Sequence, residues 1–506
     1  MIKRIISLER NIISSLENSR IPFIYFIFTF LFAATLRNFL EIFSSKASMQ
    51  FEVFTHYYLS YAALAMTLIL LFYILTRTDI LKIAKIILPS FIIIILAPLL
   101  DLILSLGKGH IITYLLPGKH NNLILRYFTF FGNFTGMGIT PGMKIEIAII
   151  LLASFTYFYI KNSKLIKSFL FTILTYTLIF GYCASPFLMK KILEIMGLEY
   201  ESSNLLFINF YLLFIFLIGV ILMYLKYKNF FKIIIKDVRP FRLLHFELMF
   251  ALGLILGINY SVFNLTAANI FHFIFIPISI AFAWVHCVIS NNIEDYNIDK
   301  ISNRERPLIK YKINTALYRK ISWFLLLVSL IYAIAVNYQT FFIILLFAGN
   351  YFLYSMYPLR LKRVLLLSKL LISFNSLILV ILGFITVSAL IHDFPKIIIA
   401  IFLIGLTSII NFIDIKDYKG DKKAGIKTLP VVLGLKKGKF AIGIFFILAY
   451  LSICFIIREI YIVVSFFLLG IIQFFLINKR NYKESDIFFI YLVSITILFF
   501  YLLSSP

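Results

Sequence analysis

Two acidic stretches, each directly after an apolar run, carry side chains that can bind a metal ion. Each has three oxygen-bearing residues, spaced i, i+4, i+8 in the first stretch and i, i+3, i+7 in the second: Asn291, Asp295 and Asp299, then Asp414, Asp417 and Asp421. Both spacings put the three side chains on one face of a helix. Two carboxylate faces turned toward each other repel unless cations lie between them. Oxygen ligands suit a hard ion such as Mg²⁺, which also binds substrate phosphates.

The alternative interpretation of either stretch is a solvated loop between membrane helices, because acidic loops are common. The pairing of the two stretches argues against this alternative. Each has helical spacing, and each stands at the end of an apolar helix. Aspartates at the centre of a bilayer would cost about 2.5–3.5 kcal/mol each. We therefore expect the two rows to line a wet cavity at the mouth of the helices.

The two stretches resemble the paired motifs of the UbiA superfamily of membrane prenyltransferases. The run from Asn291 to Asp299, followed by Arg306 and Pro307, is similar to the family's NDxxDxxxD motif. The run from Asp414 to Asp421 is similar to its DxxDxxxD motif and continues in the typical way. The resemblance covers about residues 237–506. It departs at Asn292, which stands where the family has an aspartate, so one carboxylate is missing.

The resemblance implies Mg²⁺-dependent transfer of a prenyl group from a polyprenyl diphosphate to an aromatic, tetrapyrrole or lipid acceptor within the membrane. The metal ligands it implies are Asn291, Asp295, Asp299, Asp414, Asp417 and Asp421, with Asp295, Asp299, Asp417 and Asp421 as the catalytic residues. The substrate-binding residues it implies are Arg306, Tyr354, Tyr357, Lys362, Arg363 and Asn291. The alternative for the two tyrosines is an interfacial aromatic belt. The alternative for Lys362 and Arg363 is charge that sets membrane topology.

The composition identifies an integral, multi-pass membrane protein. The chain has 506 residues, of which 62% are hydrophobic, and its mean hydropathy is +0.98. Apolar runs of about twenty residues recur throughout. The net charge of +25 lies in short loops between these runs, which indicates positive-inside topology and not nucleic-acid binding. The three cysteines form no CxxC pair, so neither a disulfide framework nor a zinc site is expected.

The apolar runs predict an all-α polytopic fold with two parts. Nine runs between residues 243 and 503 match the number of helices expected for a UbiA-type bundle, and about six runs between residues 23 and 225 form an extra module. We place the boundary between residues 1–230 and 231–506, in a basic segment from Lys226 to Arg242 that is expected on the cytoplasmic surface. Residues 1–20 alternate apolar and basic positions, which favours an interfacial amphipathic helix over a cleaved signal peptide.

Basic residues follow the second, fourth, sixth and eighth runs of the second part, and the odd-numbered connections hold at most one each. Because cytoplasmic loops are enriched in lysine and arginine, both acidic stretches are predicted to face the cytoplasm. We expect the membrane to be a prokaryotic cell membrane.

The first part carries no recognised catalytic motif, and two interpretations stay open. It is either a docking scaffold for a partner of the same pathway or a second active module that uses Asp101 and the glycine-rich connection from Gly107 to Met143. An intramembrane carboxylate is a functional candidate. The alternative is that Asp101 lies near a helix end and reaches water.

Two other functions compete with the prenyltransferase. The first is a cation- or lipid-handling transporter, which would favour an inverted repeat between the halves, and none is evident in the sequence. The second is a degenerate protein that binds prenyl diphosphate without turnover because of Asn292. In that case, Asn292→Asp should raise activity.

Overall fold

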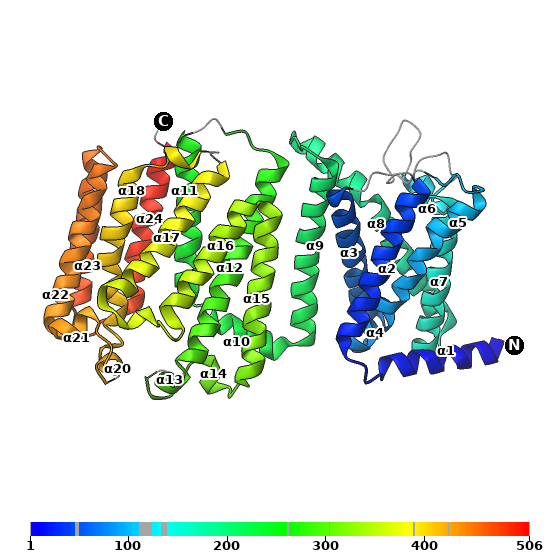
Figure 1. The fold of residues 1–506 in the computed structure, drawn as a ribbon, viewed down its shortest axis with the longest axis horizontal. Helices are drawn as coiled ribbons and strands as arrows, with labels where there is room; N and C mark the ends of the chain where they lie inside the picture. The colour runs from blue at the N-terminus through cyan, green and yellow to red at the C-terminus, as the bar shows by residue number, and fades with distance from the viewer. Residues whose placement is uncertain are drawn as a thin grey trace. The chain divides into compact units, whose positions relative to one another are not determined.

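A computed structural model describes residues 2–45, 50–110, 123–132, 139–260, 263–302, 304–387, 390–423 and 425–504. Within these ranges the regular elements are all helices (Figure 1). The chain divides into two compact units. Unit 1 is residues 1–228 with 266–268, and unit 2 is residues 229–265 with 269–506.

Unit 1 is built from long apolar helices with one amphipathic helix before them. Its elements are α1 (Ile2–Glu17), α2 (Phe23–Ser45), α3 (Phe51–Thr76), α4 (Ile80–Ser90), η1 (Phe91–Ile95), α5 (Leu96–Leu104), α6 (Leu123–Phe128), α7 (Pro141–Asn162), α8 (Leu165–Met196) and α9 (Ser203–Lys226). The elements α4, η1 and α5 follow one another without a break and together make one span.

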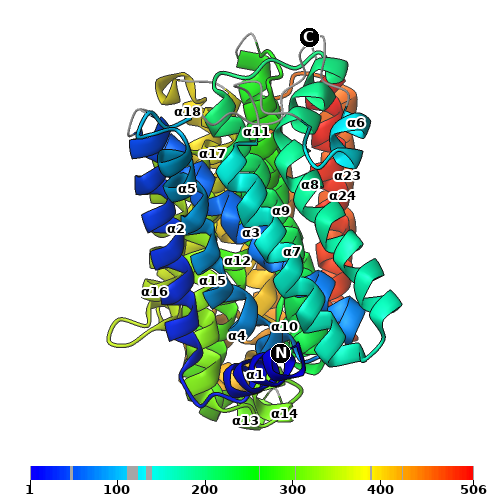
Figure 2. The same cartoon turned by 90° about the vertical axis from the view of Figure 1, so that its right-hand side faces the viewer.

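Helix α1 lies across the ends of the other helices of unit 1, as Figures 1 and 2 show. Glu17 at its end pairs with Lys161 of α7 at 2.6 Å, and Lys85 of α4 donates to the carbonyl of Ser19 at 2.6 Å. An amphipathic helix in this position has its apolar side against the bundle and its polar side toward the membrane surface. This agrees with the interfacial helix expected for residues 1–20.

Asp101 is a structural anchor in α5. Its carboxylate accepts hydrogen bonds from the backbone N–H of Gly142 at 2.8 Å and from the hydroxyl of Thr140. Thr140 is the N-cap of α7, so Asp101 satisfies donors at the start of that helix. The expectation that Asp101 reaches water is wrong, because the side chain is buried. Residues 111–122 and 133–138 of the glycine-rich connection lie outside the described residues.

Unit 2 contains the remaining helices. They are α10 (Lys228–Asp237), α11 (Pro240–Tyr260), α12 (Ala267–Glu294), α13 (Tyr296–Ser302), α14 (Pro307–Lys310), α15 (Thr315–Val336), α16 (Tyr338–Ser355), η2 (Leu361–Arg363), α17 (Leu365–Val387), η3 (Ile391–Asp393), α18 (Lys396–Ala400), η4 (Ile401–Leu406), α19 (Thr407–Ile409), η5 (Ile410–Asp414), α20 (Tyr418–Lys423), α21 (Leu429–Leu433), α22 (Leu435–Leu451), η6 (Ser452–Phe455), α23 (Ile460–Asn478) and α24 (Glu484–Ser504). The run from α18 to η5 forms one continuous span.

The number of long helices agrees with the sequence-based expectation of about six and nine. In the described ranges, fourteen helices are long and apolar enough to cross a membrane, six in unit 1 and eight in unit 2. The 18-residue helix α16 is a ninth long helix of unit 2. The all-α polytopic fold with six and nine long helices is therefore confirmed for the described part of the chain.

The core of unit 2 depends on close contact between α11 and α17. A Cβ atom at Gly253 would lie 1.9 Å from the carbonyl oxygen of Val380, and one at Gly383 would lie 2.0 Å from that of Phe250. Glycine at these positions lets the two backbones touch, which is how helices gain dispersion energy within lipid. Phe246, packed against Trp284 and Phe347 at ring-centroid distances of 5.1 Å, extends this core to α12 and α16.

Candidate active site

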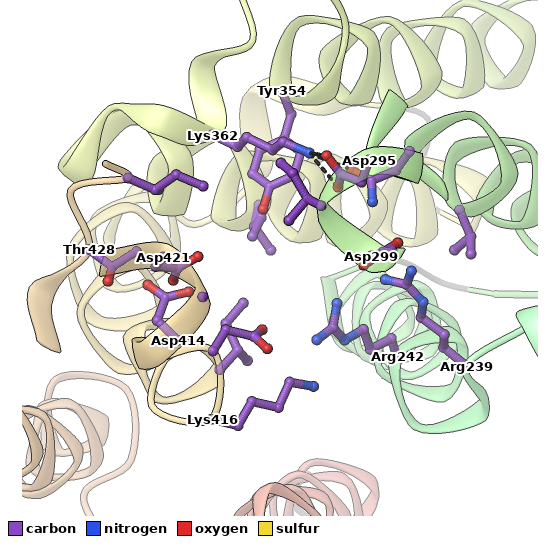
Figure 3. A pocket seen from close by; sticks show the side chains of 18 of the residues that line it. Arg239, Arg242, Asp295, Asp299, Tyr354, Lys362, Asp414, Lys416, Asp421 and Thr428 are labelled. Atoms are coloured by element: carbon purple, nitrogen blue, oxygen red, sulfur yellow. Dashed lines mark hydrogen bonds and ion pairs between the residues drawn. The ribbon is translucent and has the colours of Figure 1, made fainter. Parts of the chain in front are cut away.

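One polar pocket of about 300 Å³ lies where the long helices of unit 2 end. Figure 3 shows that carboxylates and cations from several helices point into it. Its polar lining comes from α11, α12, α13, α16, α17, η5 and α20 and the segments next to them: Arg239, Arg242, Asn291, Asp295, Asp299, Arg306, Tyr354, Lys362, Lys369, Asp414, Lys416, Asp417, Lys419, Asp421 and Thr428. Both predicted acidic rows are therefore brought to one pocket, at the same end of unit 2.

The first row is held by nearly continuous helix. Helix α12 ends at Glu294 and α13 begins at Tyr296. The backbone N–H groups of Asp295 and Asp299 still donate to the carbonyls four residues earlier, at 2.9 and 2.8 Å. Because the i→i−4 pattern continues across the junction, Asn291, Asp295 and Asp299 share the face that lines the pocket.

The second row is built differently from the expected single helix. The 3₁₀-helix η5 ends at Asp414, turns follow, and α20 begins at Tyr418. The N–H of Asp417 donates to the Asp414 carbonyl at 3.2 Å, and the N–H of Asp421 donates to the Asp417 carbonyl at 2.9 Å. These successive i→i−3 and i→i−4 bonds preserve the predicted i, i+3, i+7 face although no regular helix spans it.

Asp295 is held by two cations. Lys362 Nζ lies 2.6 Å from each of its carboxylate oxygens, and Arg360 Nη2 lies 2.5 Å from Oδ1. Lys362 also donates to Asn291 Oδ1 at 3.1 Å. Burial lowers the pKa of Lys362, while Asp295 beside it acts in the opposite sense. The predicted substrate-binding residue Lys362 thus lies in the pocket, next to the predicted metal ligand Asp295.

Asp414 is paired with Lys369, a residue that the motifs do not include. The Lys369 Nζ to Asp414 Oδ1 distance is 2.6 Å, and both side chains are buried. Asp414 Oδ2 is buried with no hydrogen-bond partner. A lysine inside an apolar span is costly unless it has a partner or a function. Its place within the apolar helix α17 is the signal that sequence reasoning missed.

Asp417 and Asp421 form no ion pair within 4 Å in the part of the chain that the structure describes. Burial, followed by repulsion from Asp414 and Asp417, raises the pKa of Asp421 to about 7. Burial also raises the pKa of Asp417, although Lys416 opposes the shift. These two carboxylates therefore lack the positive charge that Asp295 and Asp414 already have.

The donor set fits a hard divalent cation that is shared with a phosphate. The described residues contain no group of three or more His, Cys, Asp or Glu side chains placed to hold an ion by themselves. Mg²⁺ commonly uses one or two carboxylates together with waters and substrate phosphates. The unpartnered oxygen of Asp414 and the uncompensated Asp417 and Asp421 meet that requirement, and all donors are oxygens.

Three arginines gather at the side of the pocket next to Asp299. Arg306 Nε lies 3.8 Å from Asp299 Oδ2. Burial and the positive charges of Arg306 and Arg242 lower the pKa of Arg239. Arg239 and Arg242 come from the end of the basic segment that we expected on the cytoplasmic surface, and both line the pocket, which we did not expect. A basic segment at a domain boundary gives no signal that separates topology charge from a binding role.

Two ion pairs that share the carboxylate of Glu484 also border the pocket. Glu484, at the start of α24, pairs with Arg242 at 3.2 Å and also with Lys416. The arginine and lysine that face the pocket are thereby fixed by a carboxylate that is not among its lining residues. Nothing in the sequence near Glu484 indicates this role, since the partner residues are far away along the chain.

Asn292 does not face the pocket. Its side-chain N–H donates to Asp237 Oδ1 at 3.0 Å, and its oxygen accepts from Arg239 Nη2 at 2.8 Å. The asparagine is buried. Asn292 thus links the carboxylate of Asp237 to Arg239, which lines the pocket. Asn292 itself is not among the lining residues.

Two predicted substrate-binding residues lie outside the pocket lining. Helix α16 ends at Ser355 and Met356 is extended, so Tyr357 does not continue the face that carries Tyr354 into the pocket. Tyr357 is 56% exposed and its hydroxyl accepts from Arg360 Nη1 at 2.6 Å. Arg363 lies over the Tyr357 ring at 5.9 Å. Tyr357 and Arg363 are therefore not among the residues that line the pocket. Arg360, which the sequence reasoning did not single out, joins Lys362 at Asp295.

Comparison with known proteins agrees with this geometry. The model of the UbiA prenyltransferase family matches residues 248–503. This chain belongs to the UbiA prenyltransferase family. It is therefore an enzyme of prenyl transfer in membranes, and the acidic rows lie within the part that carries the family match.

Relatives of this UbiA prenyltransferase include archaeal enzymes. A digeranylgeranylglyceryl phosphate synthase of Thermococcus sibiricus is 31% identical over 202 residues, which cover 38% of this chain and 67% of the relative. One of Pyrococcus horikoshii is 30% identical over 171 residues, which cover 33% and 59%. A solved UbiA homolog of Archaeoglobus fulgidus bound to GPP and Mg²⁺ has a TM-score of 0.44 and 19% identity, covering 54% of this chain and 98% of its own.

Proposed function

We propose that this UbiA prenyltransferase binds the diphosphate of a polyprenyl diphosphate between its two acidic rows, with Mg²⁺, and transfers the prenyl group to a phosphorylated lipid acceptor. The observation that carries the proposal is the meeting of Asp295 and Asp299 with Asp414, Asp417 and Asp421 in one pocket that is also lined by cations. Five carboxylates and several cations around about 300 Å³ suit a polyanion together with divalent ions.

In this proposal the metal is held from one side by Asp414, Asp417 and Asp421. It is held from the other side by Asn291, Asp295 and Asp299. Bound Mg²⁺ supplies charge neutralisation to the departing diphosphate. Lys362 and Arg306 donate to diphosphate oxygens, since charge-assisted hydrogen bonds to phosphate are strong. Arg360 and Lys369 limit the repulsion among the carboxylates when the pocket is empty.

The prenyl chain is proposed to extend into an apolar cavity that shares five lining residues with the polar pocket. This cavity is lined by aromatic and aliphatic side chains, among them Phe246, Trp284, Phe488 and Tyr491. Such walls exclude water from an allylic cation, and their ring faces stabilise positive charge. The C–O bond to diphosphate breaks, and its electron pair leaves on the diphosphate oxygen. The acceptor hydroxyl oxygen forms the new bond to carbon, and its proton passes to the departing diphosphate.

The arginines support a phosphorylated acceptor. Arg239, Arg242 and Lys416 line the pocket beside the acidic rows, and relatives at 27–31% identity are named digeranylgeranylglyceryl phosphate synthases. Arginine binds phosphate in a bidentate way. Arg242 and Lys416 already pair with Glu484. Arg239 forms no ion pair within 4 Å among the described residues, and its buried Nε has no hydrogen-bond partner there, so a phosphate on the acceptor would supply its counter-charge.

All residues that line the pocket belong to unit 2. We propose that residues 231–506 carry the chemistry and that residues 1–230 form a separate membrane module, which docks a pathway partner. The pocket is proposed to face the cytoplasm of a prokaryotic cell, on the evidence of the loop charges.

The test measures transfer by the purified full-length enzyme from labelled geranylgeranyl diphosphate. Two acceptors are compared in parallel, a monoalkylglyceryl phosphate and the same molecule without its phosphate. We expect product only with the phosphorylated acceptor. Asp417→Asn should lower the rate at least about a hundredfold. Asp486→Asn, a matched change at an exposed position of α24, should leave it unchanged. Transfer to both acceptors alike would refute the acceptor assignment, and undiminished transfer by Asp417→Asn would refute the site.

A further inference from the structure

A second cavity, of about 310 Å³, lies within unit 1 and takes no part in the prenyl-transfer site. Its walls are mainly aliphatic and aromatic, and they come from α1, α3, α4, η1, α7 and α8. Three charged side chains also line it: Glu9 of α1, Arg37 of α2 and Glu146 of α7. A largely apolar pocket of this size with a few convergent polar groups is typical of a ligand site.

The cavity is long and narrow. Its lining along α3 runs from Tyr61 to Phe72, a rise of about 16 Å at 1.5 Å per residue. Near Phe72, the side chains of Ile13 and Leu16 close it, so the interfacial helix α1 covers this end. A volume of about 310 Å³ over that length has room for one hydrocarbon chain.

The other end of the cavity is polar. Arg37 is buried and binds two carboxylates, with Nε 2.9 Å from Glu41 and Nη1 2.9 Å from Glu146. The carbonyl of Ile94 accepts from the same guanidinium. With all three groups ionised, their formal charges sum to one negative charge. Tyr61 of α3, which interacts electrostatically with Arg37 and Glu146, also lines the cavity.

A purely structural role for these charges is hard to justify physically. An arginine within a membrane span is costly, and replacing buried ion pairs by apolar side chains is often stabilising. Here Arg37 and Glu146 face a cavity and not only each other. Polar groups that border an apolar slot orient a ligand that has one polar end.

We propose that unit 1 binds a neutral, single-chain lipid alcohol in this cavity. The chain lies along α3 and the hydroxyl lies between Tyr61 and Glu146. A hydroxyl donates to a carboxylate and accepts from a phenol, so it satisfies both groups. A phosphate or carboxylate head would meet an excess of negative charge, because Arg37 is already shared by two glutamates.

The experiment uses full-length protein in detergent and a hexadecanol that carries a photoreactive diazirine in its chain. Peptide mapping should place the label in α3, α4 or α7. Unlabelled hexadecanol should compete with the photoreactive probe at a concentration at least about tenfold lower than hexadecyl phosphate requires. Tyr61→Phe, which removes only the hydroxyl, should weaken binding about two- to tenfold.

A paired substitution tests the cavity itself. Ile150→Trp fills the slot, whereas Leu152→Trp, on the same helix but 65% exposed, does not. Labelling should fall with Ile150→Trp and persist with Leu152→Trp. Label outside unit 1, equal competition by the alcohol and the phosphate, or wild-type affinity in Tyr61→Phe would each overturn the proposal. If Ile150→Trp does not fold, as judged by gel filtration, Tyr61→Phe alone decides.

Discussion

The side-chain amide of Asn292 donates a hydrogen bond of 3.0 Å to the carboxylate of Asp237, and both residues are buried. An aspartate at position 292 would have no proton to donate and would set two carboxylates against each other. The departure from the family motif is therefore matched by a second carboxylate, Asp237, so Asn292 does not by itself indicate a degenerate enzyme.

Asn292→Asp should destabilise the protein by about 1–3 kcal/mol, because a buried hydrogen bond is replaced by like charges. The double variant Asn292→Asp with Asp237→Asn restores one donor and one carboxylate and should recover most of the loss. Thermal unfolding in detergent measures both. Asn297→Asp, the same change at an exposed position, is the control. Higher activity and unchanged stability in Asn292→Asp would instead support the degenerate-enzyme hypothesis.

Asp237 should also make stability depend on pH. Burial raises its pKa to about 6, above the value near 4 expected in the unfolded chain. The folded state therefore binds this proton more tightly, and the associated stability is fully present below about pH 4 and is lost as pH rises through about 6. Unfolding temperatures of wild type and Asp237→Asn should be similar below about pH 4, and the variant should be the more stable at about pH 7.5. A difference in unfolding temperature between wild type and variant that does not change with pH would contradict this prediction.

The Lys369–Asp414 ion pair predicts that substitutions of these two residues have strongly non-additive effects on the stability of the protein. Lys369→Met leaves a buried, uncompensated carboxylate and should cost about 3–5 kcal/mol. The double variant with Asp414→Asn should be much less destabilised than the sum of the two single variants, as a double-mutant cycle measures. Lys437→Met, on an exposed part of α22, should change stability by less than about 0.5 kcal/mol. Additive losses would show that the two residues do not interact.

Arg306 should contribute to the binding of the prenyl diphosphate. Its only ion pair within 4 Å in the described ranges is the long one to Asp299, at 3.8 Å, so the side chain keeps donors for a ligand. Arg306→Gln should raise KM for the prenyl diphosphate by about tenfold or more, the worth of a charged hydrogen bond. Arg304→Gln, two residues away and exposed, should leave KM unchanged. An equal effect of both changes would indicate a general loss of positive charge.

Removal of metal should abolish transfer without unfolding the protein. EDTA should stop the reaction, added Mg²⁺ should restore it, and the helical circular dichroism should stay constant. Because the pKa of Asp421 is about 7, protons compete with metal below that pH, and the Mg²⁺ needed for half activity should rise up to about tenfold per pH unit. In Asp421→Asn this pH dependence should weaken. Full activity in EDTA would exclude the proposed metal role.

The sequence by itself determined the membrane class, the positions of the spans and the two acidic rows. Hydropathy and helical spacing are local properties, so they are readable from neighbouring residues, and Asp414, Asp417 and Asp421 keep a common face even where turns replace a helix. The family resemblance also singled out Lys362 and Tyr354, and both line the pocket.

Only the tertiary structure decided which other charges belong to the site. Lys369 and Arg360 reach Asp414 and Asp295 across 45 and 65 residues of chain, and Asn292 turns away from the pocket toward Asp237. These contacts depend on how distant helices pack. A charged residue in a loop has the same local sequence pattern whether it faces solvent or a carboxylate, so its partner is set by the fold and not by its neighbours in sequence.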